Sequence, residues 1–166
     1  MFDEIPVSGA KYNRGDWSQY AVHDENNIKG FFGKYRWISN FEPCEIWYEG
    51  MKYKSSEAAY QACKCLPEYR LEFENISAYQ AKKEWKKWPK LYAPEKWNEI
   101  KFEIMAAIVF EKFFRNVDLR HKLLETGLKT LVELNHWRDT EFGVDINLGG
   151  QNKLGQILMK VREFWK

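Results

Sequence analysis

The sequence predicts a mainly α fold of the α+β class: a single compact helical domain with a small β-hairpin near its N-terminal side. Most segments with a hydrophobic period are typical of helices bounded by proline, glycine or capping residues. Only one segment has the pattern of two short strands joined by a tight turn. The 166 residues are enough to bury one core, and they contain no internal repeat.

The N-terminal part is expected to contribute little regular structure. Residues 1–28 are polar and rich in Asn, Asp and Gly, without a lasting hydrophobic period, so we expect a loosely structured lead-in before a domain at 29–166. The hairpin is expected at 45–54, where two short apolar runs flank the dipeptide Glu49-Gly50.

Local start and stop signals delimit the later elements. The longest helix, 95–116, carries apolar residues on most of its sides, so we expect it to be the central core element. The segments expected are a helix from Ser55 or Ser56 to Pro67, one from Ser77 to Lys87, one from Pro94 to Asn116, one from Asp118 to Thr126, an extended segment from Thr130 to Leu134 and a helix from Asn152 to Trp165.

Composition indicates a globular chain and excludes little else. Hydrophobic residues make up 45% and charged residues 30%, while the net charge of +2 is too small to indicate nucleic-acid binding by itself. Aromatic residues reach 17%, with eight Trp. Such residues build cores, and they also stack on bases and sugars, so composition alone does not separate these uses.

The cysteines indicate reduced thiols and a cytoplasmic protein. Cys44, Cys63 and Cys65 are odd in number and lie far from the three histidines, which argues against a disulfide framework and against a metal site. The acidic N-terminus lacks the apolar run of a signal peptide, and 104–110 is too short to cross a bilayer. We therefore expect no membrane association.

The helix after the hairpin sorts its residues onto two faces. Glu57, Tyr60, Gln61 and Lys64 fall within one polar stripe, while the opposite side carries mostly small residues. Small residues let neighbouring elements approach closely, so we expect this helix to be packed deep. The stripe is either solvated or, on a buried helix, a functional site.

A block at 82–90 interleaves five lysines with two tryptophans. It could bind phosphate or stack on bases. Alternatively, Trp85 and Trp88 face the core together and the lysines face water, and their i, i+3 spacing favours this second interpretation.

Two further segments are each open to two interpretations. The glycine-rich turn 149–155 leads into the last helix, so its amides could hold a phosphate, or its glycines could serve a tight turn. Asp139 could act as an acid, bind a ribose hydroxyl or form a turn, and the turn is the default.

Together these motifs resemble the NADAR (YbiA-like) family over about residues 31–162. The resemblance rests on order and spacing as well as on residue type. The matching segments are Ser39-Asn40-Phe41, Ser56 to Lys64, Trp97, Met105, Leu131-Val132-Glu133, Asp139 to Gly143 and Asn152 to Arg162.

Three departures from the family pattern are visible. Phe142-Gly143 replaces the usual Trp-Gly, Ala58 replaces an aromatic residue or His, and the Trp/Lys block 82–90 replaces a Gly-Arg. The last two bear on substrate identity rather than on reaction type.

The resemblance implies an N-glycosidase that splits the bond between ribose C1 and a nitrogen. Implied substrates are ADP-ribose attached to guanine bases, including guanine in nucleic acid, or aminopyrimidine ribosyl phosphates of riboflavin biosynthesis. The Trp/Lys block favours the first slightly. Lys64 would be the nucleophile and would form a Schiff base with the ring-opened sugar. No cofactor, metal or stable protein partner is implied.

This chemistry needs a neutral amine, although a free lysine has a pKa of about 10.4 and is protonated at neutral pH. Burial lowers that pKa, whereas a nearby carboxylate raises it. The conflict eases if Glu57 holds the proton while Lys64 is neutral, which makes Glu57 the general acid/base. The two residues start about 10 Å apart along the helix, but long side chains can converge on one sugar.

The remaining candidate residues would bind substrate. Tyr60 and Gln61 share the polar stripe with the catalytic pair, and the others are Asn40, Asp139 and Asn152 for hydroxyl or phosphate contacts and Phe32 or Trp97 for stacking on the base. The alternative function is a binding module for ADP-ribose or a nucleotide that has no turnover. The presence of both Glu57 and Lys64 argues against this alternative. The small net charge of +2 argues against a plain nucleic-acid-binding domain.

Overall fold

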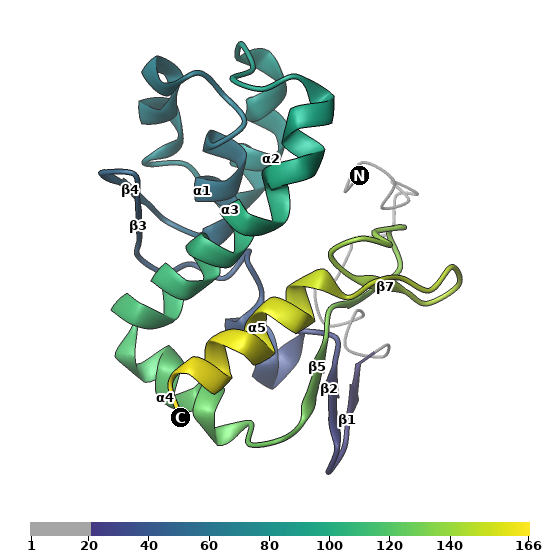
Figure 1. Ribbon diagram of the computed structural model, residues 1–166. Coiled ribbons are helices and arrows are strands. Elements are labelled where there is room, and N and C mark those ends of the chain that lie inside the picture. Colours follow the sequence, from purple (N-terminus) through teal and green to yellow (C-terminus); the bar gives the residue numbers. More distant parts are fainter. Residues whose placement is uncertain (1–20) are drawn as a thin grey trace, which may run out of the picture. The chain divides into compact units, whose positions relative to one another are not determined.

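The structure is a computed structural model that describes residues 21–166. The chain divides into two compact units, one of residues 40–123 and the other of residues up to 39 together with 124–166 (Figure 1). Helices are the main elements and short strands the minor ones, so the expected α+β class is confirmed. The single domain expected at 29–166 stays a prediction.

The unit of residues 40–123 is built around α1 (Ser56–Ala62), whose seven residues are all buried. It packs against its neighbours in this unit, which confirms the deep packing expected from its small residues. The other elements are β3 (Ile46–Tyr48), β4 (Met51–Tyr53), the 3₁₀ helices η4 (Pro67–Phe73) and η5 (Trp85–Lys87), α2 (Ala78–Glu84), α3 (Pro94–Arg115) and α4 (Val117–Glu125), which extends into the second unit.

β3 and β4 form the antiparallel pair in this unit, with Ile46 opposite Tyr53. Glu49 and Gly50 both have positive φ, at 49° and 78°, as the two central residues of a type I′ turn require. The turn brings the chain back to Ser55, whose Oγ accepts a hydrogen bond from the Ala58 amide at 3.1 Å. Ser55 is therefore the N-cap of α1.

α1 ends at Ala62, earlier than the expected end at Pro67. The backbone of the following residues bonds to a distant segment instead of continuing the helix. Lys64 O accepts from the Leu91 amide at 3.0 Å, and the Leu66 amide donates to Pro89 O at 3.0 Å. These long-range bonds replace helical ones, so Lys64 lies in the turn after α1.

The expected helix starts at Ser77 and Pro94 are confirmed. Ser77 forms a capping box with Gln80, in which each side chain bonds the other residue's backbone amide. Pro94 is the first residue of α3, where its missing N–H costs nothing. α2 ends at Glu84, and the chain continues as the tighter 3₁₀ helix η5. Together α2 and η5 cover the segment that was expected to be one helix up to Lys87.

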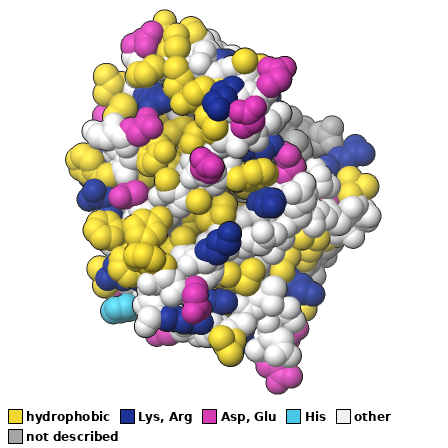
Figure 2. Space-filling model, viewed as in Figure 1, with side chains coloured by type: hydrophobic (Ala, Val, Ile, Leu, Met, Phe, Trp, Pro, Cys, Tyr) yellow, Lys and Arg dark blue, Asp and Glu magenta, His cyan; other side chains and the backbone are white. Residues whose placement is uncertain are grey.

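α3 carries apolar residues on most of its sides, as expected, but buries only one stripe of its surface. Phe114 is 48% exposed and stacks on Phe110, with ring centroids 6.2 Å apart. Figure 2 shows apolar side chains gathered on the face that carries this part of α3. Within residues 21–166, no helix is long and apolar enough to span a membrane.

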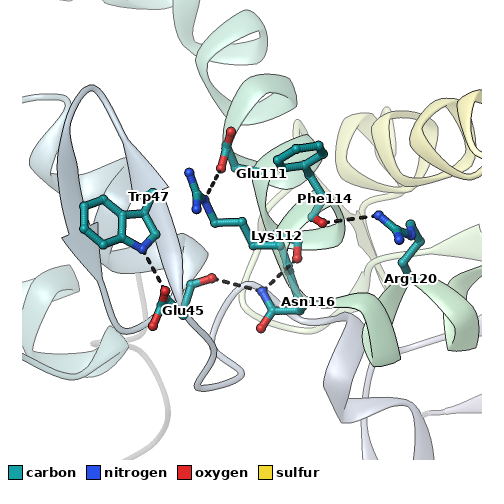
Figure 3. A network of polar contacts seen from close by, with 8 residues as sticks. Glu45, Trp47, Glu111, Lys112, Phe114, Asn116 and Arg120 are labelled. Atoms are coloured by element: carbon teal, nitrogen blue, oxygen red, sulfur yellow. Dashed lines mark hydrogen bonds and ion pairs between the residues drawn. The ribbon is translucent and has the colours of Figure 1, made fainter.

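A polar network joins the end of α3 to the start of the hairpin (Figure 3). The Asn116 side-chain amide donates to Glu45 O at 2.9 Å and to Lys112 O at 2.8 Å. Trp47 Nε1 donates to the Glu45 carboxylate at 2.7 Å. Since β4 leads into α1, these bonds help to fix α3 relative to α1.

The second unit contains a three-stranded sheet in the order β1-β2-β5. β1 and β2 are antiparallel, whereas β2 and β5 are parallel, and α5 packs on β5. A parallel pair, β6 and β7, precedes α5. The bounds are β1 (Val22–His23), β2 (Asn27–Lys29), η3 (Gly33–Ile38), β5 (Thr130–Val132), β6 (Leu134–Asn135), β7 (Val144–Asp145) and α5 (Lys153–Phe164).

The last part of the expected lead-in belongs to this sheet. Residues 21–28 contain β1 and most of β2, and Asp24 Oδ1 closes the turn between them by accepting from the amides of Asn26 and Asn27 at 2.8 and 2.7 Å. Strands of two or three residues are too short to show an alternating pattern, which is why the sequence did not predict them. Residues 1–20 lie outside the described residues.

Gly155 permits the close approach of α5 to β5. A Cβ added at this position would overlap Leu131 O and the Asn152 side chain. We therefore expect Gly155→Ala to lower the free energy of unfolding by about 1–3 kcal/mol, against the usual gain of about 1 kcal/mol for alanine in a helix. Urea unfolding measures this, with the exposed Lys160→Ala on the same helix as control. An unchanged or raised stability of Gly155→Ala would contradict the inference that α5 and β5 can approach closely only with glycine at this position.

Candidate active site

The side chain of Lys64 ends among three aromatic rings. Its Nζ lies 4.2 Å from the ring centroid of Trp85, 5.0 Å from that of Tyr60 and 5.6 Å from that of Trp97. The rings come from η5, α1 and α3, and the Tyr60 and Trp97 centroids are 5.2 Å apart. We call these three residues the aromatic box. A second lysine, Lys90, places its Nζ 4.9 Å from the Trp85 centroid.

The aromatic box affects the Lys64 amine in two opposite ways. Ring faces attract an ammonium group, which holds Nζ in place. Loss of hydration disfavours the same charge, and burial is the largest cause that lowers the pKa of Lys64 from 10.5 to about 8. Glu57 raises this pKa in part, and Lys82 lowers it further. At pH 7 about a tenth of the amine is then neutral.

Glu57 is buried on α1 and has two polar partners. Its Oε1 accepts from Gln61 Nε2 at 2.6 Å and lies 3.4 Å from Lys82 Nζ. Among the described residues, the ion pair of Glu57 is thus with Lys82 and not with Lys64. Glu57, Tyr60 and Gln61 of the polar stripe are buried and Lys64 is half-buried, so the stripe is not a solvated face.

Two polar atoms on α1 are buried without a partner among the described residues, Gln61 Oε1 and Ser56 Oγ. The side-chain NH₂ group of Gln61 donates to Glu57, so the side-chain oxygen of Gln61 is left as an acceptor. An unpaired buried acceptor costs about 1–3 kcal/mol, which favours a bound donor at this position.

Asn40 supports the start of α1 through its backbone. Its carbonyl accepts from the Glu57 amide at 3.0 Å, while its side-chain Nδ2 lies 3.2 Å from Met105 Sδ. Thioether sulfur is a weak acceptor, so this donor is only partly satisfied. The unit of residues 40–123 therefore contains six of the predicted site residues: Asn40, Glu57, Tyr60, Gln61, Lys64 and Trp97.

The other three predicted site residues lie in the second unit, and two of them have structural partners. Asp139 Oδ1 accepts from the amides of Glu141 and Phe142 at 3.1 and 2.9 Å, which is the turn-forming role expected by default. Asn152 accepts from the Glu133 amide at 3.0 Å and donates to Leu131 O at 2.9 Å. These bonds occupy both side chains locally.

Phe32 packs edge-on against Trp137, with ring centroids 6.4 Å apart. It is partly exposed. Its predicted stacking role stays a prediction.

The glycine-rich turn before α5 serves packing rather than an anion. The amides of Gln151, Lys153 and Leu154 donate to carbonyls of the 140–142 loop at 2.8 to 3.1 Å. A Cβ on Gly150 would overlap Gly143 O. Because the helix-start amides already have acceptors, the tight-turn interpretation is the one that the structure supports.

Two residues of this site were not predicted, Lys82 and Trp85. Both lie in the Trp/Lys block, whose tryptophans were expected to face the core while its lysines faced water. The exposure of Lys83, Lys86, Lys87 and Lys90 agrees with this expectation, whereas Trp88 is half-buried and its ring stacks on Tyr69 at 5.1 Å. The spacing of Trp85 and Trp88 gave no sign that the chain would tighten into η5 and aim Trp85 at Lys64.

Comparisons with known proteins agree on one family. The NADAR domain matches residues 22–165. The Riboflavin biosynthesis protein VVA0006 of Vibrio vulnificus is 39% identical over 131 residues, 76% of this chain and 34% of that protein. N-glycosidase YbiA of Escherichia coli K12 is 31% identical over 128 residues, 76% of this chain and 79% of YbiA.

A solved structure shares the fold. The NMR structure of E. coli YbiA superposes with a TM-score of 0.71 at 28% identity, over 90% of each chain. This chain spans only about a third of the Vibrio protein and 42% of the N-glycosidase Npun_R5314 of Nostoc punctiforme. The match of the NADAR domain to most of the chain, together with these relatives, shows that the protein belongs to the NADAR domain family.

Proposed function

We propose that this protein is an N-glycosidase that cleaves the bond between ribose C1 and a nitrogen in a phosphorylated ribosyl substrate. The observation that carries the proposal is the Lys64 amine, which lies in the aromatic box with its pKa lowered to about 8. An amine of this kind is a nucleophile near neutral pH. Relatives named N-glycosidases give independent support.

The proposed reaction passes through a Schiff base. The neutral Lys64 amine forms a bond to C1, and the C1–N bond breaks with its electron pair leaving on the base nitrogen. Glu57 takes the proton that Lys64 loses and passes it to the departing nitrogen. The C1–O bond of the ring then opens, the remaining N–H proton of the Lys64 nitrogen moves to the ring oxygen, and a C1 imine with Lys64 forms. Water adds to C1, which releases the sugar aldehyde and restores the amine.

The aromatic box would stack on the base, while hydroxyl and phosphate groups would meet polar side chains. Gln61 Oε1 supports this because it is a buried acceptor without a partner, and Asn40 has a weakly used donor. Asp139 and Asn152 would bind substrate only by giving up turn or backbone contacts. Phe32 remains a stacking candidate.

Two substrate classes fit this proposal. The Trp/Lys block supports ADP-ribosylated guanine, since Trp85 lies beside Lys64 and Lys90 lies beside Trp85. The name of the Vibrio relative supports a ribosyl phosphate of riboflavin biosynthesis. Incubation with each substrate, followed by chromatography of the released base, tests both. Binding of either ligand without base release would favour the non-catalytic binding module instead.

The pH dependence of turnover tests the protonation state of the nucleophile. Because only the neutral amine attacks, kcat/KM for base release should rise about tenfold per pH unit below pH 8 and level off above it. The measurement is an initial-rate series from pH 5.5 to 9.5 at constant ionic strength. A profile that is flat between pH 6 and 9 would contradict a titrating Lys64.

A further inference from the structure

α2 presents a second lysine to the carboxylate of the site. Lys82 Nζ lies 3.4 Å from Glu57 Oε1, and the side chains are 33% and 6% exposed, so water screens this pair only in part. The capping box at Ser77 fixes the first turn of α2, and α2 packs against α1. Lys82 is therefore held by a well-defined helix rather than by a loop.

Glu57 interacts with two lysines but pairs with one. The negative charge of Glu57 raises the pKa of Lys64. Lys64 Nζ nevertheless lies among the aromatic rings and forms no ion pair within the described residues. An ion pair between Glu57 and Lys64 would favour the ammonium and remove the nucleophile. The carboxylate is instead paired with Lys82.

The titratable groups that act on the pKa of Lys64 come from α1, α2, α3 and the turn after α1. Glu57 on α1 and Cys65 in the same turn raise its pKa, while Lys82 on α2 and Lys101 on α3 lower it. Lys101 Nζ bonds to Asn98 on its own helix at 3.0 Å. Lys82 thus contributes twice, as a like charge near Lys64 and as the ion-pair partner of Glu57.

We propose that Lys82 is a positioning residue of this site, which holds the Glu57 carboxylate in an ion pair and so keeps the Lys64 amine available as a nucleophile. Lys82 acts on Lys64 through Glu57 and through its charge, without touching the substrate. The catalytic meaning of this inference rests on the proposed function, whereas the electrostatic part can be measured without any substrate.

The test compares Lys82→Met, which keeps most of the side-chain length and loses the charge, with Lys82→Arg, which keeps the charge. Competitive labelling with acetic anhydride from pH 6 to 11, read by mass spectrometry of the Lys64 peptide, gives the pKa of Lys64 directly. In Lys82→Met we expect this pKa to rise by about one unit or more, since a like charge is lost and Glu57 is released. At pH 7, base release should fall about tenfold and recover at higher pH.

Lys82→Arg should leave both the labelling midpoint and the pH profile close to those of the parent protein. The matched control is Lys83→Met, the exposed neighbour on the same helix, which should change neither. An unchanged Lys64 midpoint in Lys82→Met, or an equal loss of turnover at every pH, would overturn the proposal. If the midpoint shifts but the parent protein releases no base, the proposed function fails and the role of Lys82 stands.

Discussion

Replacing Lys64 with methionine should lower base release by at least about a thousandfold, because the variant lacks the atom that bonds to C1. Methionine keeps most of the length of the side chain and fits among aromatic rings. The loss should appear in kcat and should not be restored at any pH. Steady-state kinetics with the better of the two substrate classes measures it, and Lys83→Met serves as the matched lysine control.

The fold should survive this change. The pKa of Lys64 is lower in the folded protein, at about 8, than the ordinary value of 10.5, so folding is opposed by burial of the charged amine. That cost is complete below pH 8 and disappears as the pH rises toward 10.5. Lys64→Met should therefore unfold at the same or a higher urea concentration at pH 7. Near-parental turnover by a folded Lys64→Met would exclude Lys64 as nucleophile.

Glu57→Gln should lower kcat by about 10²–10⁴-fold, the usual contribution of a general acid/base. Glutamine keeps the shape of the side chain but cannot carry the proton from Lys64 to the leaving nitrogen. The substitution also replaces the carboxylate 3.4 Å from Lys82 Nζ with a neutral amide. The exposed Glu72→Gln is the control. Substrates with more acidic leaving bases should suffer less, because they need less help from a proton donor.

Full activity of Glu57→Gln would remove Glu57 from the mechanism. A loss confined to KM would instead make it a binding residue.

Elements with local signals could be predicted from the sequence. Ser77 and Pro94 mark the helix starts because a capping side chain and a proline act within one turn. Deep packing of α1 followed from its alanines, since small residues allow close approach on several sides. In these cases the cause of the structure lies within a few residues.

The parts that were missed depend on distant contacts. α1 ends at Ala62 because Lys64 and Leu66 bond to the segment around Pro89 to Leu91. Of the strands at 22–29, β2 pairs with β5, about a hundred residues later, and β1 pairs with β2. Their two or three residues are too few to carry a period.

The candidate site shows the same division. Lys64 and Glu57 could be named from their motif, whereas the pairing of Glu57 with Lys82 arises from the packing of α2 on α1. Trp85 reaches Lys64 through the tightening of the chain at η5. A helical wheel of the Trp/Lys block cannot reveal either contact, because each depends on a partner outside the block.

Reductive trapping is the most direct test of the claim that Lys64 is the nucleophile. The protein is incubated with each substrate and sodium borohydride, and the covalent adduct is located by peptide mass spectrometry. We expect one reduced sugar adduct, on Lys64, that disappears in Lys64→Met. Base release accompanied by an adduct on another lysine, such as Lys90 beside the same Trp85 ring, or by no adduct at all, would contradict this account.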